Sequence, residues 1–162
     1  MSRGPLRGRE AYRAWRTLDT RWADNDAYGH VNNVVYYAWF DTAVNAWLID
    51  QGLLDVASGD PIGLVVETGC RYFSELAFPD RVAAGLRVGR LGTSSVRYEI
   101  GLAVERLGTS SVTYRLGVFA KDAAHAAAEG HFTHVYVARD SRRPVALPQS
   151  WREKFAAVQM GG

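Results

Sequence analysis

The segment spanning residues 32–49 constrains the fold of this chain more than any other feature. Apolar side chains fill two adjacent ridges of the helix that it would form: Val35, Trp39, Ala43 and Trp47 on one ridge, and Phe40, Val44 and Leu48 on its neighbour. A helix that is apolar around most of its circumference is wrapped by other structure rather than laid on a surface. The sequence therefore predicts a central helix, with Asn32 as its cap and Gly52 as its stop.

Short runs rich in β-forming residues, with turn residues between them, lie on both sides of this segment in the sequence. They cover residues 12–22, 63–73, 81–91, 95–104, 111–120 and 130–139. One buried helix and a series of hairpin-linked strands indicate an α+β fold. In such a fold a curved antiparallel sheet wraps around the helix.

The two ends of the chain differ from this central part. Residues 1–11 are basic and contain glycine, so we expect a flexible arm before a single domain of residues 12–162. Near the other end, Pro144 and Pro148 mark irregular structure, and Ser150 with Glu153 forms a capping-box pattern. This pattern predicts a short terminal helix that begins near Trp151 and packs on the outside.

An internal repeat covers residues 85–116. GLRVGRLGTSSVRYEI (85–100) is followed directly by GLAVERLGTSSVTYRL (101–116). Two near-identical adjacent copies indicate the tandem duplication of a strand–turn unit, whereas a solenoid needs more copies. The duplication either adds a strand, which reverses the direction of every strand after it, or loops out of the sheet.

The composition excludes several classes of protein. With 48% apolar and 22% charged residues, the 162-residue chain suits one folded domain, so disorder is excluded. A formal net charge of +2 without a long basic run predicts no nucleic-acid partner, and no apolar segment is long enough to cross a membrane. The single cysteine, Cys70, is expected to be a buried thiol in a cytoplasmic protein.

A polar turn precedes the central helix. In RWADNDAYGHVNNVVYYAW (residues 21–39), acidic and amide side chains crowd the residues that lead into the helix. An ionised carboxylate is stabilised beside the positive end of a helix dipole, and the free N–H groups of the first turn can hold an anion. Asp24 and Asn25 suit turn and capping roles, while the stretch as a whole suits acyl-transfer chemistry.

The segment DNDAYGHVNNVVYYAWFD resembles the signature of hot-dog-fold acyl-CoA thioesterases of the 4-hydroxybenzoyl-CoA thioesterase type. It also resembles the Asp-x-x-x-His-Val-Asn-Asn segment of plant acyl-carrier-protein thioesterases. RLGTSSVRYEI, AEGHFTHVYV and RRPVALP are similar to the later strands and tail of bacterial members. The resemblance covers all but the N-terminal arm and one copy of the repeat. It implies a hot-dog fold, to which the repeat is a candidate extra strand.

Carried to this sequence, the resemblance makes Asp26 the catalytic carboxylate, either as nucleophile on the thioester carbonyl or as general base for water. It gives the backbone N–H of Asn33 the oxyanion role, and His30 the task of orienting water or sharing a proton. Tyr28 stands where the plant proteins carry Asn, and it is a substrate-binding candidate. Because a thioester has a good leaving group, no cofactor and no metal are needed, and coenzyme A is part of the substrate.

Several other residues have both a structural and a functional interpretation. Tyr36 can line an acyl or aryl pocket, although aromatic residues at helical spacing more often belong to the core. Arg142 and Arg143, just after the last predicted strand, are candidates to contact the phosphates of coenzyme A. His131 and His134 lie three residues apart on a predicted strand, so they face opposite sides of the sheet and do not share a metal.

The resemblance therefore implies a thioesterase that hydrolyses an acyl- or aryl-CoA. It also implies a homodimer or homotetramer with each active site between subunits, and a half-open sheet with exposed edges independently favours association. A carrier-protein thioester as the substrate, or a hot-dog dehydratase or hydratase, is an alternative on the same fold. A non-catalytic acyl-CoA-binding module is an alternative of another class.

Overall fold

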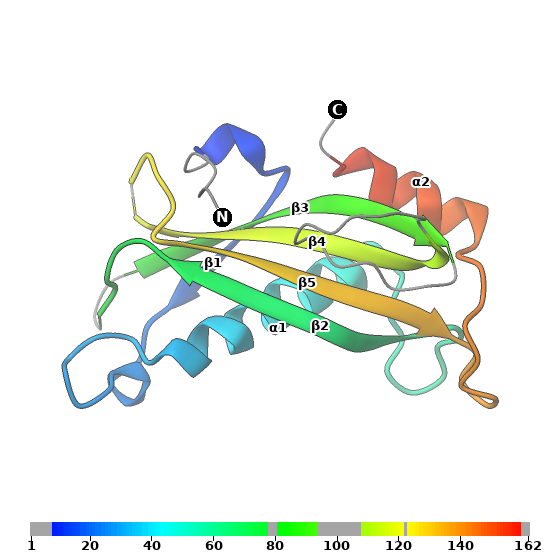
Figure 1. The fold of residues 1–162 in the computed structure, drawn as a ribbon, viewed down its shortest axis with the longest axis horizontal. Helices are drawn as coiled ribbons and strands as arrows, with labels where there is room; N and C mark the ends of the chain where they lie inside the picture. Colours follow the sequence, from blue (N-terminus) through cyan, green and yellow to red (C-terminus); the bar gives the residue numbers. More distant parts are fainter. Residues whose placement is uncertain (1–7, 78–80, 94–107, 122, 160–162) are drawn as a thin grey trace.

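The apolar segment predicted to form the central helix is α1, Asn33–Asp50. In the computed structural model, which describes residues 8–77, 81–93, 108–121 and 123–159, α1 crosses one face of an antiparallel sheet (Figure 1). Within these residues the sheet has five strands in the order β1-β3-β4-β5-β2, so β1 and β2 form its edges. The α+β class and the sheet wrapped around one helix are confirmed.

Every neighbouring pair of strands is antiparallel. The strands are β1 (Ala14–Asp19), β2 (Ile62–Tyr72), β3 (Arg81–Thr93), β4 (Gly108–Ala120) and β5 (Ala128–Val137). The last four match predicted runs to within a few residues. β1 is shorter than the predicted run at 12–22, because the chain leaves the sheet and forms a short 3-10 helix, η2 (Trp22–Asp24).

The two repeat copies contribute to one hairpin. β3 contains the beginning of the first copy, β4 contains the end of the second, and these two strands pair with each other. The predicted strand at 95–104, and with it the candidate extra strand, lies outside the described residues. Among the described residues, each copy therefore contributes one strand to this antiparallel pair.

The core lies between α1 and the sheet. Its fully buried side chains include Phe40 and Val44 from α1 and Tyr114, Leu116 and Val118 from β4. Gly130 on β5 lets the helix approach closely, since a Cβ at this position would lie 2.4 Å from the ring of Phe40. The apolar ridges identified in the sequence are thus the surface by which α1 packs on the sheet.

Both ends of α1 agree with the sequence. The side chain of Asn32 accepts a hydrogen bond from the backbone N–H of Val34 at 3.2 Å, which confirms Asn32 as the cap. Gly52 has a φ of 74° and donates its N–H to the carbonyl of Ile49, as expected of a residue that ends a helix.

A second helix, α2 (Gln149–Ala157), packs near the C-terminal end of α1. Phe155 is fully buried, and its ring lies 5.6 Å from that of Trp47 on α1. The terminal helix is confirmed, but the capping box is wrong. The helix begins at Gln149 after Pro148, which places Ser150 within the first turn, where its side chain is not the cap.

The N-terminal segment that precedes β1 is docked on the sheet through Arg9, in the 3-10 helix η1 (Arg9–Ala11). The guanidinium donates to the carbonyls of Ala123 at 2.7 Å and Ala120 at 3.1 Å, and it lies over the rings of Trp15 and Phe119. Composition assigned residues 9–11 to the flexible arm. These long-range contacts, which composition does not reveal, hold them in place.

Candidate active site

A tight turn at residues 26–30 precedes α1. The backbone N–H of Asp26 donates to the carbonyl of His30 at 2.8 Å, and the N–H of Gly29 donates back to the carbonyl of Asp26 at 3.1 Å. Gly29 has a φ of 81°, a conformation that glycine adopts without the strain that a side chain would cause. The sequence Asp-Ala-Tyr-Gly-His therefore closes on itself beside the start of the helix.

The carboxylate of Asp26 is held by this turn. Its Oδ1 atom accepts a hydrogen bond from the backbone N–H of Tyr28 at 2.8 Å and a longer one from the N–H of His30 at 3.3 Å. The side chain is half-buried, and among the described residues its Oδ2 atom has no hydrogen-bond partner. The hydrogen bonds to Oδ1 thus fix the orientation of the carboxylate and leave Oδ2 without a partner among the described residues.

Asp24 connects the residues before the turn to the start of α1 through hydrogen bonds. It is buried, and its carboxylate accepts bonds from the backbone N–H and the guanidinium of Arg21, at 2.8 to 3.1 Å. Its carbonyl accepts the N–H of Asn32, the cap of α1, at 2.8 Å. Asp24 therefore ties the start of the turn to the start of the helix, which is the structural role expected from the sequence.

Asn33 is the first residue of α1 and is exposed. Its backbone N–H has no hydrogen-bond partner within the part of the chain that the structure describes, because the side chain of Asn32 accepts from Val34 instead. An unpaired N–H at the positive end of a helix dipole is a donor for a developing oxyanion. The structure thus places the predicted oxyanion donor and the predicted carboxylate at the same helix end.

The end of β2 and the residues that follow it contact this helix end. The carbonyl of Leu76 accepts the N–H of Val31 at 2.7 Å, and the hydroxyl of Tyr72 donates to the carbonyl of Asn33 at 3.3 Å. Glu75 lies beside His30, with 3.0 Å between Oε2 and Nε2. Sequence reasoning missed Tyr72 and Glu75, and no local pattern identifies them, since the contacts depend on where the end of β2 lies in the fold.

The pairing of His30 with Glu75 takes place near the surface, where both side chains are substantially exposed. Exposed ion pairs add little stability. The chemical consequence is orientation: a carboxylate at Nε2 favours the tautomer that carries a proton there and leaves Nδ1 as an acceptor.

The two tyrosines predicted to contact the substrate differ in burial: one lies at the surface and the other in the core. Tyr28 is 85% exposed, whereas Tyr36 is buried and meets Trp39 and Tyr72 edge to face, at 5.3 and 5.0 Å between ring centres. Burial raises the pKa of Tyr36 to about 12 and that of Cys70 to about 11. Both groups are therefore protonated at neutral pH, and Cys70 is a poor nucleophile.

The structure does not bring Arg142 and Arg143 to Asp26. They are exposed and follow β5, in a turn where Arg142 has a φ of 61°. The preceding Arg139 donates to the carbonyls of Gly59 and Val56, in the loop that follows α1. This turn lies at the C-terminal end of α1, so about 27 Å of helix separates it from Asp26 in one protomer (Figure 1).

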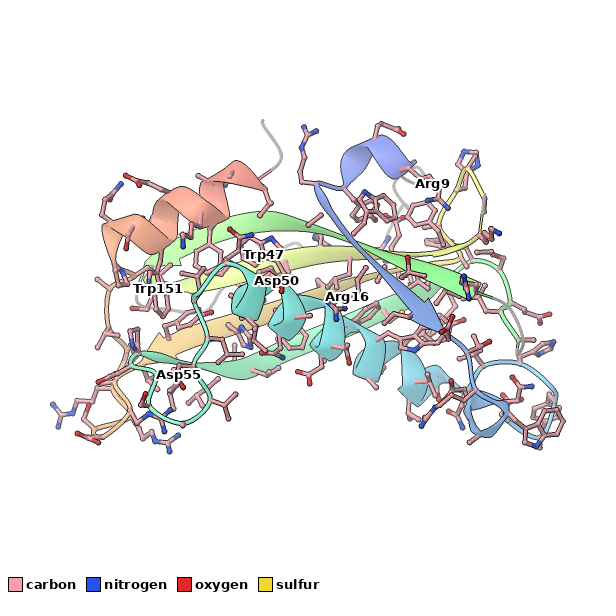
Figure 2. The ribbon with its side chains drawn as sticks, turned by 180° about the vertical axis from the view of Figure 1, so that it is seen from behind. Arg9, Arg16, Trp47, Asp50, Asp55 and Trp151 are labelled. Atoms are coloured by element: carbon pink, nitrogen blue, oxygen red, sulfur yellow. The ribbon has the colours of Figure 1, made fainter. Side chains whose placement is uncertain are left out.

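A cavity of about 30 Å³ lies between β1 and the C-terminal half of α1. Arg16 and Asp50 face each other beside it at 3.9 Å, and Trp47 lines its wall (Figure 2). A space of this size holds a water molecule but no acyl chain. This cavity therefore does not serve as the substrate pocket.

The two histidines of β5 face opposite sides of the sheet, as predicted. His131 lies 3.1 Å from Glu67 on β2, while His134 is buried among aromatic rings. Among the described residues, no group of three His, Cys, Asp or Glu side chains is placed to hold a metal ion. None of the helices in the same part of the chain has the length and apolar character needed to cross a bilayer.

Comparisons with known proteins give a consistent result. The family described as the thioesterase-like superfamily matches residues 20–155. The PA5185 protein of Pseudomonas aeruginosa strain PAO1 is 48% identical, with 98% of this chain and 99% of that chain covered and a TM-score of 0.83. A thioesterase from Thermus thermophilus, complexed with coenzyme A and Zn, is 25% identical, with 93% and 97% covered and a TM-score of 0.68. A 1,4-dihydroxy-2-naphthoyl-CoA thioesterase from Synechocystis, 19% identical over 88% and 94% of the two chains, shares the fold with a TM-score of 0.70. A search of curated proteins gave no match.

Proposed function

Since this chain belongs to the thioesterase-like superfamily, we propose that it hydrolyses the thioester of an acyl- or aryl-CoA and releases the carboxylate and free coenzyme A. The relative from Thermus thermophilus, a thioesterase solved with coenzyme A, supports this choice of substrate class. The fold alone does not determine an activity, so the proposal depends on the site at the start of α1.

The observation that carries the proposal is the arrangement of Asp26 and Asn33. Asp26 presents an oxygen without a hydrogen-bond partner among the described residues, on a carboxylate that two backbone N–H groups orient. The unpaired N–H of Asn33 lies at the same end of α1. Hydrolysis of a thioester needs a nucleophile or activated water on one side of the carbonyl and an oxyanion donor on the other, and we assign these roles to Asp26 and to the N–H of Asn33.

Two mechanisms fit this geometry. In the first, Oδ2 of Asp26 attacks the carbonyl carbon, the C–S bond breaks, coenzyme A leaves as a thiolate that takes a proton, and water hydrolyses the resulting anhydride. In the second, Asp26 takes a proton from a water molecule that attacks the same carbon. In both, the N–H of Asn33 stabilises the oxyanion of the tetrahedral intermediate. His30, oriented by Glu75, is suited to position the water or to pass on a proton.

The remaining predicted residues are assigned to substrate binding. Tyr28 is exposed beside the catalytic turn and is proposed to contact the substrate near the thioester. Tyr36 is proposed to form part of the wall next to the acyl group. Arg142 and Arg143 lie too far from Asp26 of their own chain, so we assign them to the coenzyme A phosphates in the site of a second subunit.

We propose a homodimer, which can pair further into a tetramer, formed through the edge strand β2. In the described sheet β2 pairs only with β5, and it exposes Leu64, Val65 and Val66. A long apolar edge strand favours pairing with another chain. Light scattering after size exclusion should show an oligomer that Val65→Lys converts to a monomer, while Val56→Lys, at an exposed loop position, leaves it unchanged. A wild-type monomer would refute this assembly.

The test of the activity is thiol release, measured with a thiol-reactive dye on short, long and aromatic acyl-CoAs. Asp26→Asn should lose at least about 100-fold in kcat while retaining the fold and coenzyme A binding, since an amide is neither a nucleophile nor a base. Asp50→Asn is the matched control, because it removes a carboxylate at the opposite end of α1. A fully active Asp26→Asn variant would exclude the mechanism. Lack of turnover on every coenzyme A ester would favour a carrier-protein substrate or a binding-only role.

The pair of His30 and Glu75 favours one second candidate, a hydratase or dehydratase of acyl thioesters. Such enzymes use a histidine with an acidic partner, and these two side chains lie 3.0 Å apart. Incubation with an enoyl-CoA separates the two reactions, since hydration consumes the double bond without releasing thiol. Loss of the enoyl absorbance without thiol release would replace the thioesterase assignment.

A further inference from the structure

We propose that Tyr72 is a positioning residue for this site: its hydroxyl holds the carbonyl of Asn33 and thereby aims the N–H of Asn33 at the thioester oxygen. This inference rests on the proposed function, because it assumes that Asn33 is the oxyanion donor. Tyr72 belongs to none of the residues that the sequence pattern around Asp26 selects, and it reaches the site from the end of β2, 39 residues along the chain from Asn33.

The contact joins the end of a strand to the start of a helix. Tyr72 is the last residue of β2, and its hydroxyl lies 3.3 Å from the carbonyl oxygen of Asn33 in the first turn of α1. Its ring meets the buried ring of Tyr36 edge to face, 5.0 Å away and at 85°. Tyr72 is 43% exposed, so this ring contact and the hydrogen bond of the hydroxyl to Asn33 are what restrain its side chain.

The end of β2 is itself anchored, which makes it a suitable support. The backbone N–H groups of Phe73 and Ser74 both donate to the carbonyl of Ala127, at 2.8 and 3.1 Å. Leu76 is buried, and its carbonyl accepts the N–H of Val31 at 2.7 Å. The segment that carries Tyr72 is therefore bound both to the sheet and to the residues that lead into α1.

The first turn of a helix needs such a support, because its N–H groups lack partners within the helix and its end frays readily. The side chain of Asn32 restrains the N–H of Val34. Tyr72 restrains the carbonyl of Asn33, which shares one planar peptide unit with the N–H of Val34. With this peptide unit held from both sides, the first turn keeps its helical φ and ψ angles, and these angles set the direction of the N–H of Asn33. An oxyanion donor contributes most when it is held in place before the charge develops.

The hydroxyl is protonated under working conditions. Burial, with the neighbouring Cys70 as a further cause, raises the pKa of Tyr72 well above its usual value. The phenol is therefore an O–H donor at neutral pH; the carbonyl of Asn33 accepts from it at 3.3 Å, and the side chains of Cys70 and Tyr37 lie close enough to interact with the same hydroxyl. This agrees with a fixed hydrogen bond rather than with a role in proton transfer.

Tyr72→Phe tests the proposal, because it removes the hydroxyl and keeps the ring against Tyr36. We expect kcat for thioester hydrolysis to fall about 3- to 10-fold with KM changed less than about twofold, since a less well positioned oxyanion donor weakens binding of the transition state more than binding of the substrate. Tyr12→Phe is the matched control: it also removes a tyrosine hydroxyl with a hydrogen bond, to Glu129 at 3.0 Å, from a cluster separate from the α1 core. Its kcat should equal that of the wild type.

Amide hydrogen exchange gives a second reading that does not depend on activity. In Tyr72→Phe the first turn of α1 should exchange faster than in the wild type, and in Tyr12→Phe it should not. An unchanged kcat in an active protein overturns the proposal, and so does a rise in KM with kcat retained, which would make Tyr72 a substrate-binding residue. If the wild type hydrolyses no thioester, the proposed function fails; unchanged exchange in Tyr72→Phe then overturns the inference separately.

Discussion

Replacing His134 by glutamine is expected to remove much of the acid sensitivity of this fold. The imidazole is 3% exposed, and the rings of Phe132, Tyr114 and Tyr136 surround it edge to face at 4.9 to 5.9 Å. Its Nδ1 atom has no hydrogen-bond partner among the described residues. Burial lowers the pKa of His134 from its usual 6.5 to about 4, because this surrounding does not solvate a positive charge.

The sign and size of the effect follow from this pKa. Between pH 6.5 and about 4 the unfolded chain binds a proton at His134 that the folded chain does not, so stability is fully present above pH 6.5 and is lost as the pH falls. At about 1.4 kcal/mol for each pH unit, the full loss is about 3 kcal/mol. Most of it should have occurred by about pH 4.5. The rings of Tyr114 and Tyr136 contact the imidazole, and their hydroxyls remain neutral, since burial raises the pKa of both.

The assay is urea unfolding at fixed protein concentration, from about pH 7.5 to 4.5, for the wild type and His134→Gln. The difference in unfolding free energy between the two proteins should shrink by about 2 to 3 kcal/mol as the pH falls, because only the wild type has the buried imidazole. The carboxylates affect both proteins equally and cancel in this difference. His125→Gln, at an exposed position, is the control and should follow the wild type. Parallel curves for the wild type and His134→Gln would refute the argument that burial keeps this histidine neutral.

Two further predictions concern packing and reactivity. Gly130→Ala should destabilise the fold by about 1 to 3 kcal/mol in urea unfolding, because the added Cβ would lie 2.4 Å from the ring of Phe40 and 2.8 Å from the carbonyl oxygen of Gly69; an unchanged midpoint would show that α1 can move away at little cost. Cys70 should react with a thiol-reactive dye far more slowly in the folded protein than in urea, because burial raises its pKa to about 11; equal rates would show that the thiol is open to solvent.

The helix could be predicted in detail because its determinants are local. The apolar ridges, the Asn32 cap and the Gly52 stop lie within or beside the segment that they define, and each was found where the sequence placed it. The terminal helix shows the limit of such patterns. Ser150 and Glu153 have the right spacing for a capping box, but Pro148 ends the preceding extended segment and starts the helix earlier.

The candidate site likewise contains residues that a local sequence segment identifies and residues that only the fold brings there. The turn that orients Asp26 closes within five residues, so it lies wholly inside the segment whose family resemblance selected Asp26 as a candidate. Tyr72 and Glu75 reach the same place only because β2 pairs with β5 and ends beside the start of α1. A pairing between distant strands leaves no pattern in the sequence near Asp26, and these two residues therefore had to come from the structure.

The strand β2 links the two proposals of assembly and catalysis. It exposes Leu64, Val65 and Val66 along the edge proposed to pair with a second subunit, and it ends at Tyr72, which contacts Asn33. Pairing of this edge would restrain the strand along its length, and hence the residue that holds the first turn of α1. We therefore expect a monomeric Val65→Lys variant to show faster amide exchange at the start of α1, as Tyr72→Phe does. Combining the two substitutions should then add less than the sum of their separate effects on exchange, because both act through the same strand end.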